Sequence, residues 1–170
     1  LFSSPFALGW SHYASQLLLE TGYFAGSPGF KFSAQKRELL QCARVLADVG
    51  YNLGLSVPKN FPVCSGERWS LEVGEMFYAR GAFESRQTAR QEMARSVHSA
   101  GQLPVYKLGH TALVEGRDHA AAQLGSRFDM GQFHREFLDL GPLGLADITE
   151  EIAQLTMLQK QNETRLESLS

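Results

Sequence analysis

Apolar residues recur every three or four positions along almost the whole chain, and no segment alternates convincingly with a period of two. This pattern is typical of helices that bury one face. The first such pattern covers residues 6–20, and its apolar stripe consists of Phe6, Trp10, Tyr13, Leu17 and Leu18. We therefore predict an all-α fold with six to eight helices in one domain.

Capping residues and apolar faces place the later helices. Ser33 is expected to cap a helix over about residues 33–49, which Gly50 would end. The buried face of that helix is predicted to consist of Leu39, Ala43, Leu46 and Val49. Shorter helices are predicted over 70–80, 85–98 and 130–140, a long one over 101–124, and a last one from about residue 145. Residues 1–155 would then form the helical region, and the polar tail over 156–170 should fray.

The charge balance and the start of the chain bear on partners and location. The formal net charge of −2 gives no electrostatic reason to expect nucleic acid or an anionic membrane as the partner. No apolar run approaches the roughly 20 residues that cross a bilayer, and the start shows no signal segment. The chain begins at Leu1 rather than Met, which indicates a piece of a longer polypeptide. We expect a soluble protein, with the cytoplasm slightly favoured as its location.

The histidines and cysteines form no recognisable catalytic motif. A helical zinc site of the peptidase type needs two histidines four positions apart, and no two of the five histidines have that spacing. Glu115 and His119 share a helix face, for which a surface contact is the favoured interpretation. Cys42 is expected to be a buried free thiol, and Cys64 lies in the longest predicted loop. We therefore expect no metal and no cofactor to be bound by this chain alone.

Residues 101–109 combine polar groups with a helical spacing. Gln102, Tyr106 and Gly109 would lie on one face of the helix over 101–124. An amide and a phenol on a packed face each need a hydrogen-bond partner. Helix packing against a small residue and a surface that faces a ligand are both open interpretations, and spacing alone favours the first.

At this segment the sequence resembles a known family in four stretches. Residues 8–14 are similar to an E-G-W-A-x-Y-A helix, and residues 44–52 to an R…D-T-G-x-H stretch. Residues 101–109, followed by Arg117, are similar to W-P-G-Q-A-x-x-Y-K-x-G, and residues 124–143 to L-G-x-x-F-D-x-x-x-F-H…G-x-x-P-L. These are motifs of the bacterial domain-of-unknown-function family numbered eight hundred and eighty-five. The resemblance covers about residues 6–155 and implies the C-terminal part of a helical, gluzincin-like zinc-peptidase relative.

The departures from the family pattern bear on function. In the family, the two zinc-binding histidines and the general-base Glu lie upstream of everything in this chain. The third ligand is expected to be the Glu of E-G-W-A, and that position is Leu8, which cannot coordinate zinc. Tyr106 is retained, and the resemblance makes it a candidate oxyanion donor. The resemblance also implies a degenerate site with the ligand-binding candidates Gln102, Lys107, Arg117 and Asn52, the last at the position of the family histidine.

Three interpretations of function stay open. The favoured one is a non-catalytic or incomplete C-terminal part of a zinc-peptidase-like protein that binds a ligand or a partner. The second is one part of a zinc-dependent peptide or amide hydrolase whose HExxH half lies upstream or on another chain, in which case zinc enters only with that missing part. The third is a generic helical interaction domain. The expected partner is the remainder of the same polypeptide or another protein chain.

Overall fold

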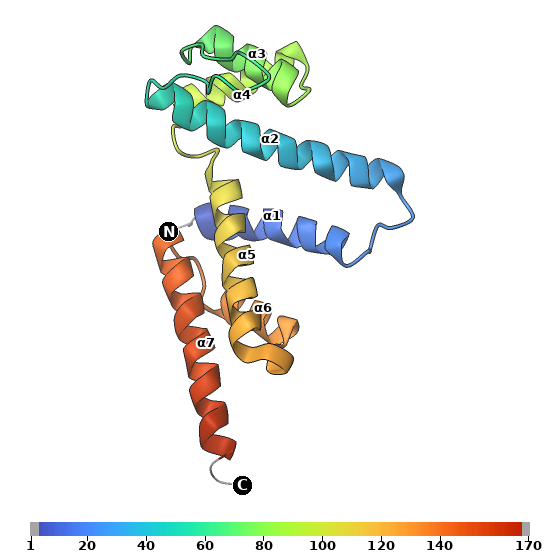
Figure 1. Cartoon of the computed structure of the whole chain (residues 1–170), viewed down its shortest axis with the longest axis vertical. Coiled ribbons are helices and arrows are strands. Elements are labelled where there is room, and N and C mark those ends of the chain that lie inside the picture. The colour runs from blue at the N-terminus through green and yellow to red at the C-terminus, as the bar shows by residue number, and fades with distance from the viewer. Residues whose placement is uncertain (1–3, 168–170) are drawn as a thin grey trace. The chain divides into compact units, whose positions relative to one another are not determined.

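The computed structural model describes residues 4–167, with side chains described for residues 5–158 and 160. Figure 1 shows the order of the elements along the chain. They are α1 (Ser4–Glu20), α2 (Pro28–Asn52), α3 (Leu71–Gly81), α4 (Arg86–His98), α5 (Val105–Leu124), the 3-10 helix η1 (Gly125–Arg127), α6 (Met130–Asp139) and α7 (Leu145–Glu167). The predicted all-α fold is confirmed, since the only β pairing in the described part is an isolated bridge between Ser56 and Arg68.

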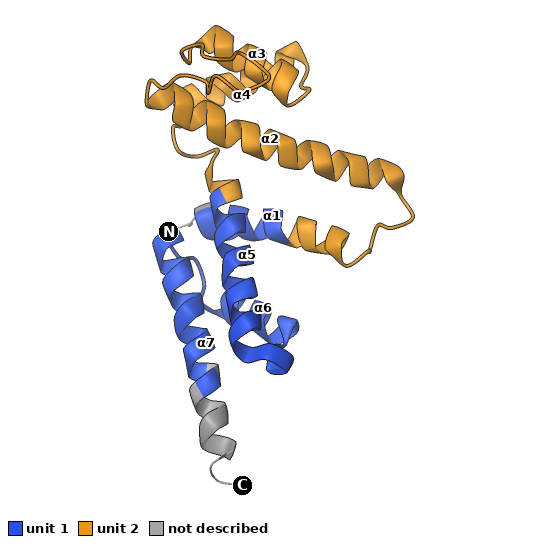
Figure 2. Ribbon diagram, in the orientation of Figure 1, with its two compact units in different colours: residues 1–13, 108–170 blue, residues 14–107 orange. Residues whose placement is uncertain are grey.

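The helices form two compact units (Figure 2). Unit 1 comprises residues 1–13 and 108–170, and unit 2 comprises residues 14–107. Helices α1 and α5 therefore each contribute one part to unit 1 and the other part to unit 2.

Side-chain caps define the starts of three helices. Ser70 accepts a hydrogen bond from the Val73 amide at 3.2 Å, and Ser85 accepts one from the Thr88 amide at 3.1 Å. At the start of α6, the Asp129 carboxylate accepts from the amide of Gln132 at 2.6 Å. Each cap satisfies one of the amide groups that a helix leaves without an internal partner at its first turn.

The bounds predicted for α2 are wrong at both ends. The helix begins at Pro28, whose fixed φ suits the first helical position, and Ser27 is its N-cap residue. Ser33 lies inside the helix, where its hydroxyl donates to the Gly29 carbonyl at 2.9 Å. Gly50 does not end the helix either, because α2 continues to Asn52. A Cβ at Gly50 would lie 2.2 Å from Nε1 of Trp69, so the glycine is needed for packing rather than for a stop.

The predicted buried face of α2 is also mostly wrong. Ala43 is buried, but Leu39, Leu46 and Val49 are each 39% exposed. Small residues face the core instead, namely Ala43, Ala47 and Gly50, because α2 packs closely against α3 and α4 on that side. In α1, Leu18 of the predicted stripe is likewise exposed, whereas Tyr13 is fully buried.

Each unit has its own core. In unit 2, Val57, Trp69, Phe77, Tyr78 and Met93 pack between the loop before α3 and the helices α2, α3 and α4. Gly74 is required there, since a Cβ would lie 2.1 Å from the Met93 sulfur. In unit 1, the largest fully buried side chains are Tyr13, Leu113, Phe137, Ile148 and Ile152. These come from α1, α5, α6 and α7, so all four helices share one core.

Three smaller expectations can be compared with the structure. Cys42 and Cys64 are free thiols, and both are half-buried rather than buried. Among the described residues, no helix has both the length and the apolar character that a membrane crossing requires. Helix α7 continues to Glu167, and the remainder of the tail over 156–170, for which fraying was predicted, lies outside the described residues.

Candidate functional site

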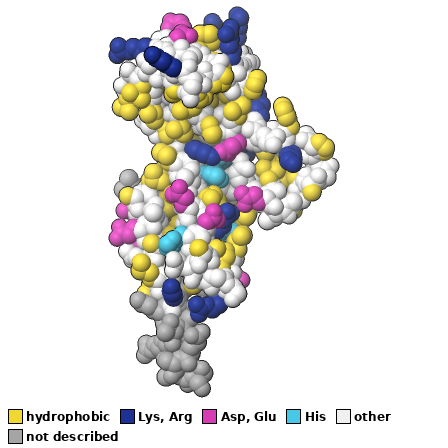
Figure 3. Space-filling view, viewed as in Figure 1, with side chains coloured by type: hydrophobic (Ala, Val, Ile, Leu, Met, Phe, Trp, Pro, Cys, Tyr) yellow, Lys and Arg dark blue, Asp and Glu magenta, His cyan; other side chains and the backbone are white. Residues whose placement is uncertain are grey.

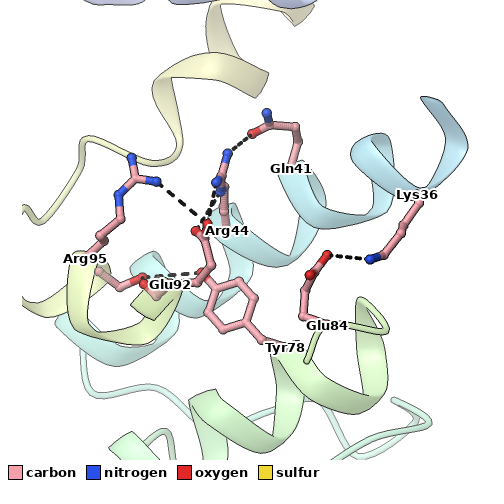
Figure 4. A network of polar contacts seen from close by, with 8 residues as sticks. Lys36, Gln41, Arg44, Tyr78, Glu84, Glu92 and Arg95 are labelled. Carbon is pink, nitrogen blue, oxygen red and sulfur yellow. Dashed lines mark hydrogen bonds and ion pairs between the residues drawn. The ribbon is translucent and has the colours of Figure 1, made fainter. Parts of the chain in front are cut away.

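Unit 2 contains a buried ion pair between α2 and α4 (Figure 4). Arg44 donates from Nε to Oε2 of Glu92 at 2.8 Å and from a terminal nitrogen to Oε1 at 2.6 Å. Two parallel bonds of this kind form the strongest type of side-chain pair in proteins. Arg95 approaches the same carboxylate at 3.7 Å, and Gln41 accepts a long bond of 3.4 Å from Arg44. The side chains of Arg44 and Glu92 are only 12% and 9% exposed.

Burial and charge act in opposite directions on the groups around this pair. Burial alone would lower the pKa of Arg44, but the hydrogen bonds to Glu92 and the charge of that carboxylate outweigh it, so the pKa of Arg44 is raised. Burial raises the pKa of Tyr78 to about 12, although a 3.4 Å hydrogen bond with Ser96 opposes the shift. Arg44 therefore stays charged and Tyr78 stays neutral at physiological pH.

Asp48 lies about one helical turn before the end of α2 and is 3% exposed. Its Oδ1 accepts from the Gly101 amide at 3.0 Å. Asn52 donates to the Asp48 carbonyl at 2.9 Å and to the Ser96 carbonyl at 3.1 Å. The other carboxylate oxygen of Asp48, Oδ2, is buried without a hydrogen-bond partner among the described residues. These bonds tie the end of α2 to the end of α4 and to the turn that precedes α5.

The polar residues predicted for the start of α5 are only partly brought together. Tyr106 is half-buried, and the guanidinium carbon of Arg44 lies 5.8 Å from its ring centroid. Lys107 forms an ion pair with Glu38 of α2. Both side chains therefore contact charged residues of α2.

Gln102 does not share a helix face with Tyr106 and Gly109, so that prediction is wrong. It is exposed in the turn over 101–104, and α5 begins only at Val105. Gly101 has a φ of +79°, a left-handed conformation that ordinary helices do not contain. Pro104 also disfavours helical geometry at the residue before it.

Unit 1 holds a second polar cluster, built on α1, α5 and α6. The Tyr13 hydroxyl and Nε2 of His134 are 2.8 Å apart, and the ring of Trp10 meets that of His134 edge-on at 5.5 Å. The guanidinium carbon of Arg117 lies 5.7 Å from the centroid of the Tyr13 ring. A phenol, an imidazole and a guanidinium are thus held together beside aromatic rings.

The pKa values in this cluster follow from burial and from neighbouring charge. Desolvation lowers the pKa of His134, and the positive charge of Arg117 lowers it further. Desolvation would lower the pKa of Arg117, but its 2.9 Å hydrogen bond to Asp118 and its interaction with Tyr13 raise it overall. His134 therefore favours its neutral form, in which one ring nitrogen can accept a hydrogen bond from the Tyr13 hydroxyl.

Leu8 is half-buried on α1 in this unit. It immediately precedes Gly9, where α1 and α5 approach each other most tightly. A Cβ at Gly9 would lie 2.6 Å from Cα of Gly109, so both glycines are needed for the crossing. The aliphatic side chain of Leu8 has no atom that could coordinate a metal.

Other titratable groups do not gather into a metal centre. No group of three or more His, Cys, Asp or Glu side chains suited to a metal ion occurs in the described part of the chain. The rings of His12 and His110 lie 4.6 Å apart between centroids in unit 1. Glu115 and His119 are both exposed on α5.

Sequence reasoning missed the partner of Arg44. Arg44 and Asp48 belong to a stretch that resembles the family pattern, but Glu92 lies 48 residues further along the chain. A glutamate in the charge-rich helix α4 gives no sign in the sequence that it is buried. Its apolar neighbour Met93, also buried, is the one local hint that this side of α4 faces inward.

A family model described as "Bacterial protein of unknown function (DUF885)" matches residues 1–152. The chain belongs to this family. Its fold is similar to that of a solved structure titled "The crystal structure of the putative lipoprotein from Colwellia psychrerythraea", with a TM-score of 0.76 and 23% sequence identity. The match covers 90% of this chain and 24% of that protein, so the chain spans about a quarter of that relative's length. No curated protein sequence matches the chain.

At 23% identity this similarity establishes the fold alone. The sequence slightly favoured the cytoplasm as the location. A structural neighbour whose title calls it a lipoprotein gives that expectation no support. The DUF885 match does confirm the family to which the sequence motifs pointed.

Proposed function

We propose that this chain is the C-terminal helical part of a zinc-peptidase-like protein, and that this part binds a ligand or partner without catalysing hydrolysis. The observation that carries the proposal is Leu8. In the motif that the surrounding residues resemble, the glutamate expected to be the third zinc ligand stands at this position, and leucine supplies no donor atom.

The retained packing around Leu8 supports the proposal. Gly9 and Gly109 still form the tight crossing of α1 and α5, and Trp10, Tyr13 and His134 still form a packed aromatic cluster in unit 1. The scaffold of the motif is thus intact while the side chain that would bind the metal is replaced. A protein that has lost catalysis but kept its fold is expected to retain the packing residues and to replace the metal ligand.

The binding role is assigned to polar groups that remain near the surface. In unit 2, Gln102 is exposed, while Tyr106 and Lys107 are half-buried beside Arg44 and Glu38. In unit 1, Arg117 is the corresponding candidate. Asn52 is the weakest candidate, since its amide already donates to two backbone carbonyls.

The relative length of the solved neighbour supports the view that further polypeptide accompanies this part. The chain spans about a quarter of that protein. Any histidine helix of a zinc peptidase would then belong to the remainder, and zinc would enter only with it. The retained groups of this chain would supply a phenol at Tyr106 and cationic side chains at Lys107 and Arg117.

Hydrolysis of unstructured peptides by the protein made from its complete reading frame, with added zinc, tests the proposal. We expect no cleavage above that of buffer. Cleavage that a chelator abolishes and that a Tyr106→Phe variant reduces would instead support the hydrolase alternative, with the Tyr106 phenol as an oxyanion donor.

A further inference from the structure

Helix α2 carries a stripe of apolar side chains that unit 2 does not bury. We call this the α2 seam; it consists of Phe32, Leu39, Cys42, Leu46 and Val49, together with Leu53, the C-cap residue directly after the helix. Leu39, Leu46 and Val49 are each 39% exposed, and Phe32 and Leu53 are each 68% exposed. The space-filling view shows hydrophobic side chains gathered on the visible face of unit 2, over α2 (Figure 3).

The spacing of the residues in the α2 seam indicates that its partner is a helix. Its last five members, from Leu39 to Leu53, follow one another at steps of three, four, three and four residues, and Phe32 lies one heptad before Leu39. Such a 3.5-residue repeat is the pattern with which one helix packs along another. The neighbouring side of α2 is already used, since Ala43, Ala47 and Gly50 pack into the core of unit 2.

The surroundings of the α2 seam identify the chemistry of the partner. A groove of about 200 Å³ continues the seam, and its walls include Val45, Leu55, Pro58 and Phe61. No charged side chain lines this groove. Towards the start of α2, the nearby charges Lys36 and Glu38 are already paired with Glu84 and Lys107. The partner is therefore apolar on its contact face and needs no complementary charge.

We propose that the α2 seam is the docking surface for an apolar helix from the remainder of the same polypeptide. Separate chains that pair through heptads usually use flanking charges to select the partner and the register. The positions that flank Leu46 and Val49 hold Ala43, Val45, Gly50 and Asn52 instead, and none of these can make such a selection. A covalently joined partner needs no selection, and the chain spans only about a quarter of its solved neighbour.

This inference rests on one part of the proposed function, that further polypeptide accompanies the chain, and it does not depend on the loss of zinc binding. Stoichiometric zinc in the complete protein would contradict the non-catalytic role and leave the α2 seam unaffected. An uncovered seam would contradict the inference and leave the zinc result unaffected.

Thiol labelling compares the α2 seam in two proteins, the 170-residue chain and the product of the complete reading frame. Both carry Cys42→Ala and Cys64→Ala, which leaves an introduced thiol as the only one in the 170-residue chain. Any cysteine elsewhere in the complete reading frame is replaced by alanine as well. Leu46→Cys reports on the seam. Leu71→Cys, at the start of α3 and 46% exposed, is the matched control in the same unit. Val49→Cys repeats the measurement if Leu46→Cys does not fold by circular dichroism.

In the 170-residue chain we expect the seam and control thiols to react with a maleimide at similar rates. In the complete protein the ratio of seam to control rates should fall at least about tenfold, because reagent then reaches the seam only after local opening. An unchanged ratio would overturn the proposal. So would protection already present in the 170-residue chain, which would place another part of this chain on the seam. Protection that grows with protein concentration would identify a second copy and would equally overturn it.

Discussion

Replacing Arg44 by methionine removes one half of the buried ion pair that joins α2 to α4. Two charges with centres about 4 Å apart attract by about 4 kcal/mol at an effective dielectric constant of about 20. The Glu92 side chain is 9% exposed, so its carboxylate would be left as a buried charge with Arg95 at 3.7 Å as partial compensation. Breaking a buried pair costs about 3–5 kcal/mol, and because of Arg95 we expect about 3 kcal/mol, the lower end.

Tryptophan fluorescence can follow unit 2 by itself in this experiment. The chain has two tryptophans, Trp10 in unit 1 and Trp69 in unit 2. In a Trp10→Phe background the remaining tryptophan lies in the core of unit 2, where it is 8% exposed. Urea unfolding of that protein then gives the free energy of unfolding of unit 2. In a thermal scan, the Arg44→Met change should lower the midpoint by about 6–12 °C for a protein of this length.

Two further variants separate the buried pair from charge effects in general. Arg90→Met removes an exposed pair, whose side chains Arg90 and Glu75 are 72% and 39% exposed, and should cost at most about 1 kcal/mol. The double variant Arg44→Met with Glu92→Leu leaves neither charge of the pair buried alone and should recover most of the lost stability. The reasoning is refuted if Arg44→Met costs no more than Arg90→Met, or if the double variant is as unstable as the single one.

Two more changes test the cores of the separate units. The pKa of His134 is lowered by burial and by Arg117, so the folded state favours the neutral ring. The contribution of His134 to the free energy of unfolding is therefore complete above about pH 6.5, the pKa of an unfolded histidine. It decreases as the pH falls through the lower pKa of the folded state. His134→Gln should therefore reduce the loss of stability between about pH 7.5 and about pH 5.5, measured by urea unfolding, and an unchanged loss would argue against this assignment. Gly50→Ala should destabilise unit 2 by about 1–3 kcal/mol, because its Cβ would lie 2.2 Å from Trp69. Gly26→Ala, with no atom within 4 Å of the new Cβ, is the control that should change little.

The sequence was sufficient to predict the helices that carry local signals. The helices predicted over 70–80, 85–98 and 130–140 begin within one residue of α3, α4 and α6, because the hydrogen bond of an N-cap joins residues only three positions apart. The start of α2 was misplaced, because Ser27 followed by Pro28 is also a valid helix start and the spacing around Ser33 did not distinguish them. When two local signals for a helix start are equally strong, tertiary packing determines where the helix begins.

The burial of α2 could not be predicted from its apolar residues. Leu39, Leu46 and Val49 form the more hydrophobic face, yet unit 2 buries the face with Ala43 and Ala47. The close approach of α3 and α4 selects small residues, and a hydrophobic pattern does not reveal this preference. Our inference is that the more hydrophobic face packs against a helix outside this chain.

The sequence likewise predicted some features of the candidate site and not others. Tyr106 and Lys107 were found from their motif, and both contact charged residues of α2. Gln102 was misplaced, because Gly101 and Pro104 keep the turn over 101–104 out of the helix. Arg44 and Glu92 lie 48 positions apart along the chain and meet only because α2 packs against α4. The spacing of residues along one helix cannot show such a contact.

The zinc content of the complete protein tests the central claim most directly. The wild-type protein and its Leu8→Glu variant would be equilibrated with zinc, freed of unbound metal and measured by mass spectrometry of the metal, with Leu18→Glu as a control on the same helix. Leu18 is already 41% exposed, so its replacement should change nothing. We predict that the wild-type protein retains far less than one zinc per polypeptide. One zinc held firmly by the wild-type protein would contradict the account, because Leu8 would then not stand at a position that the metal requires.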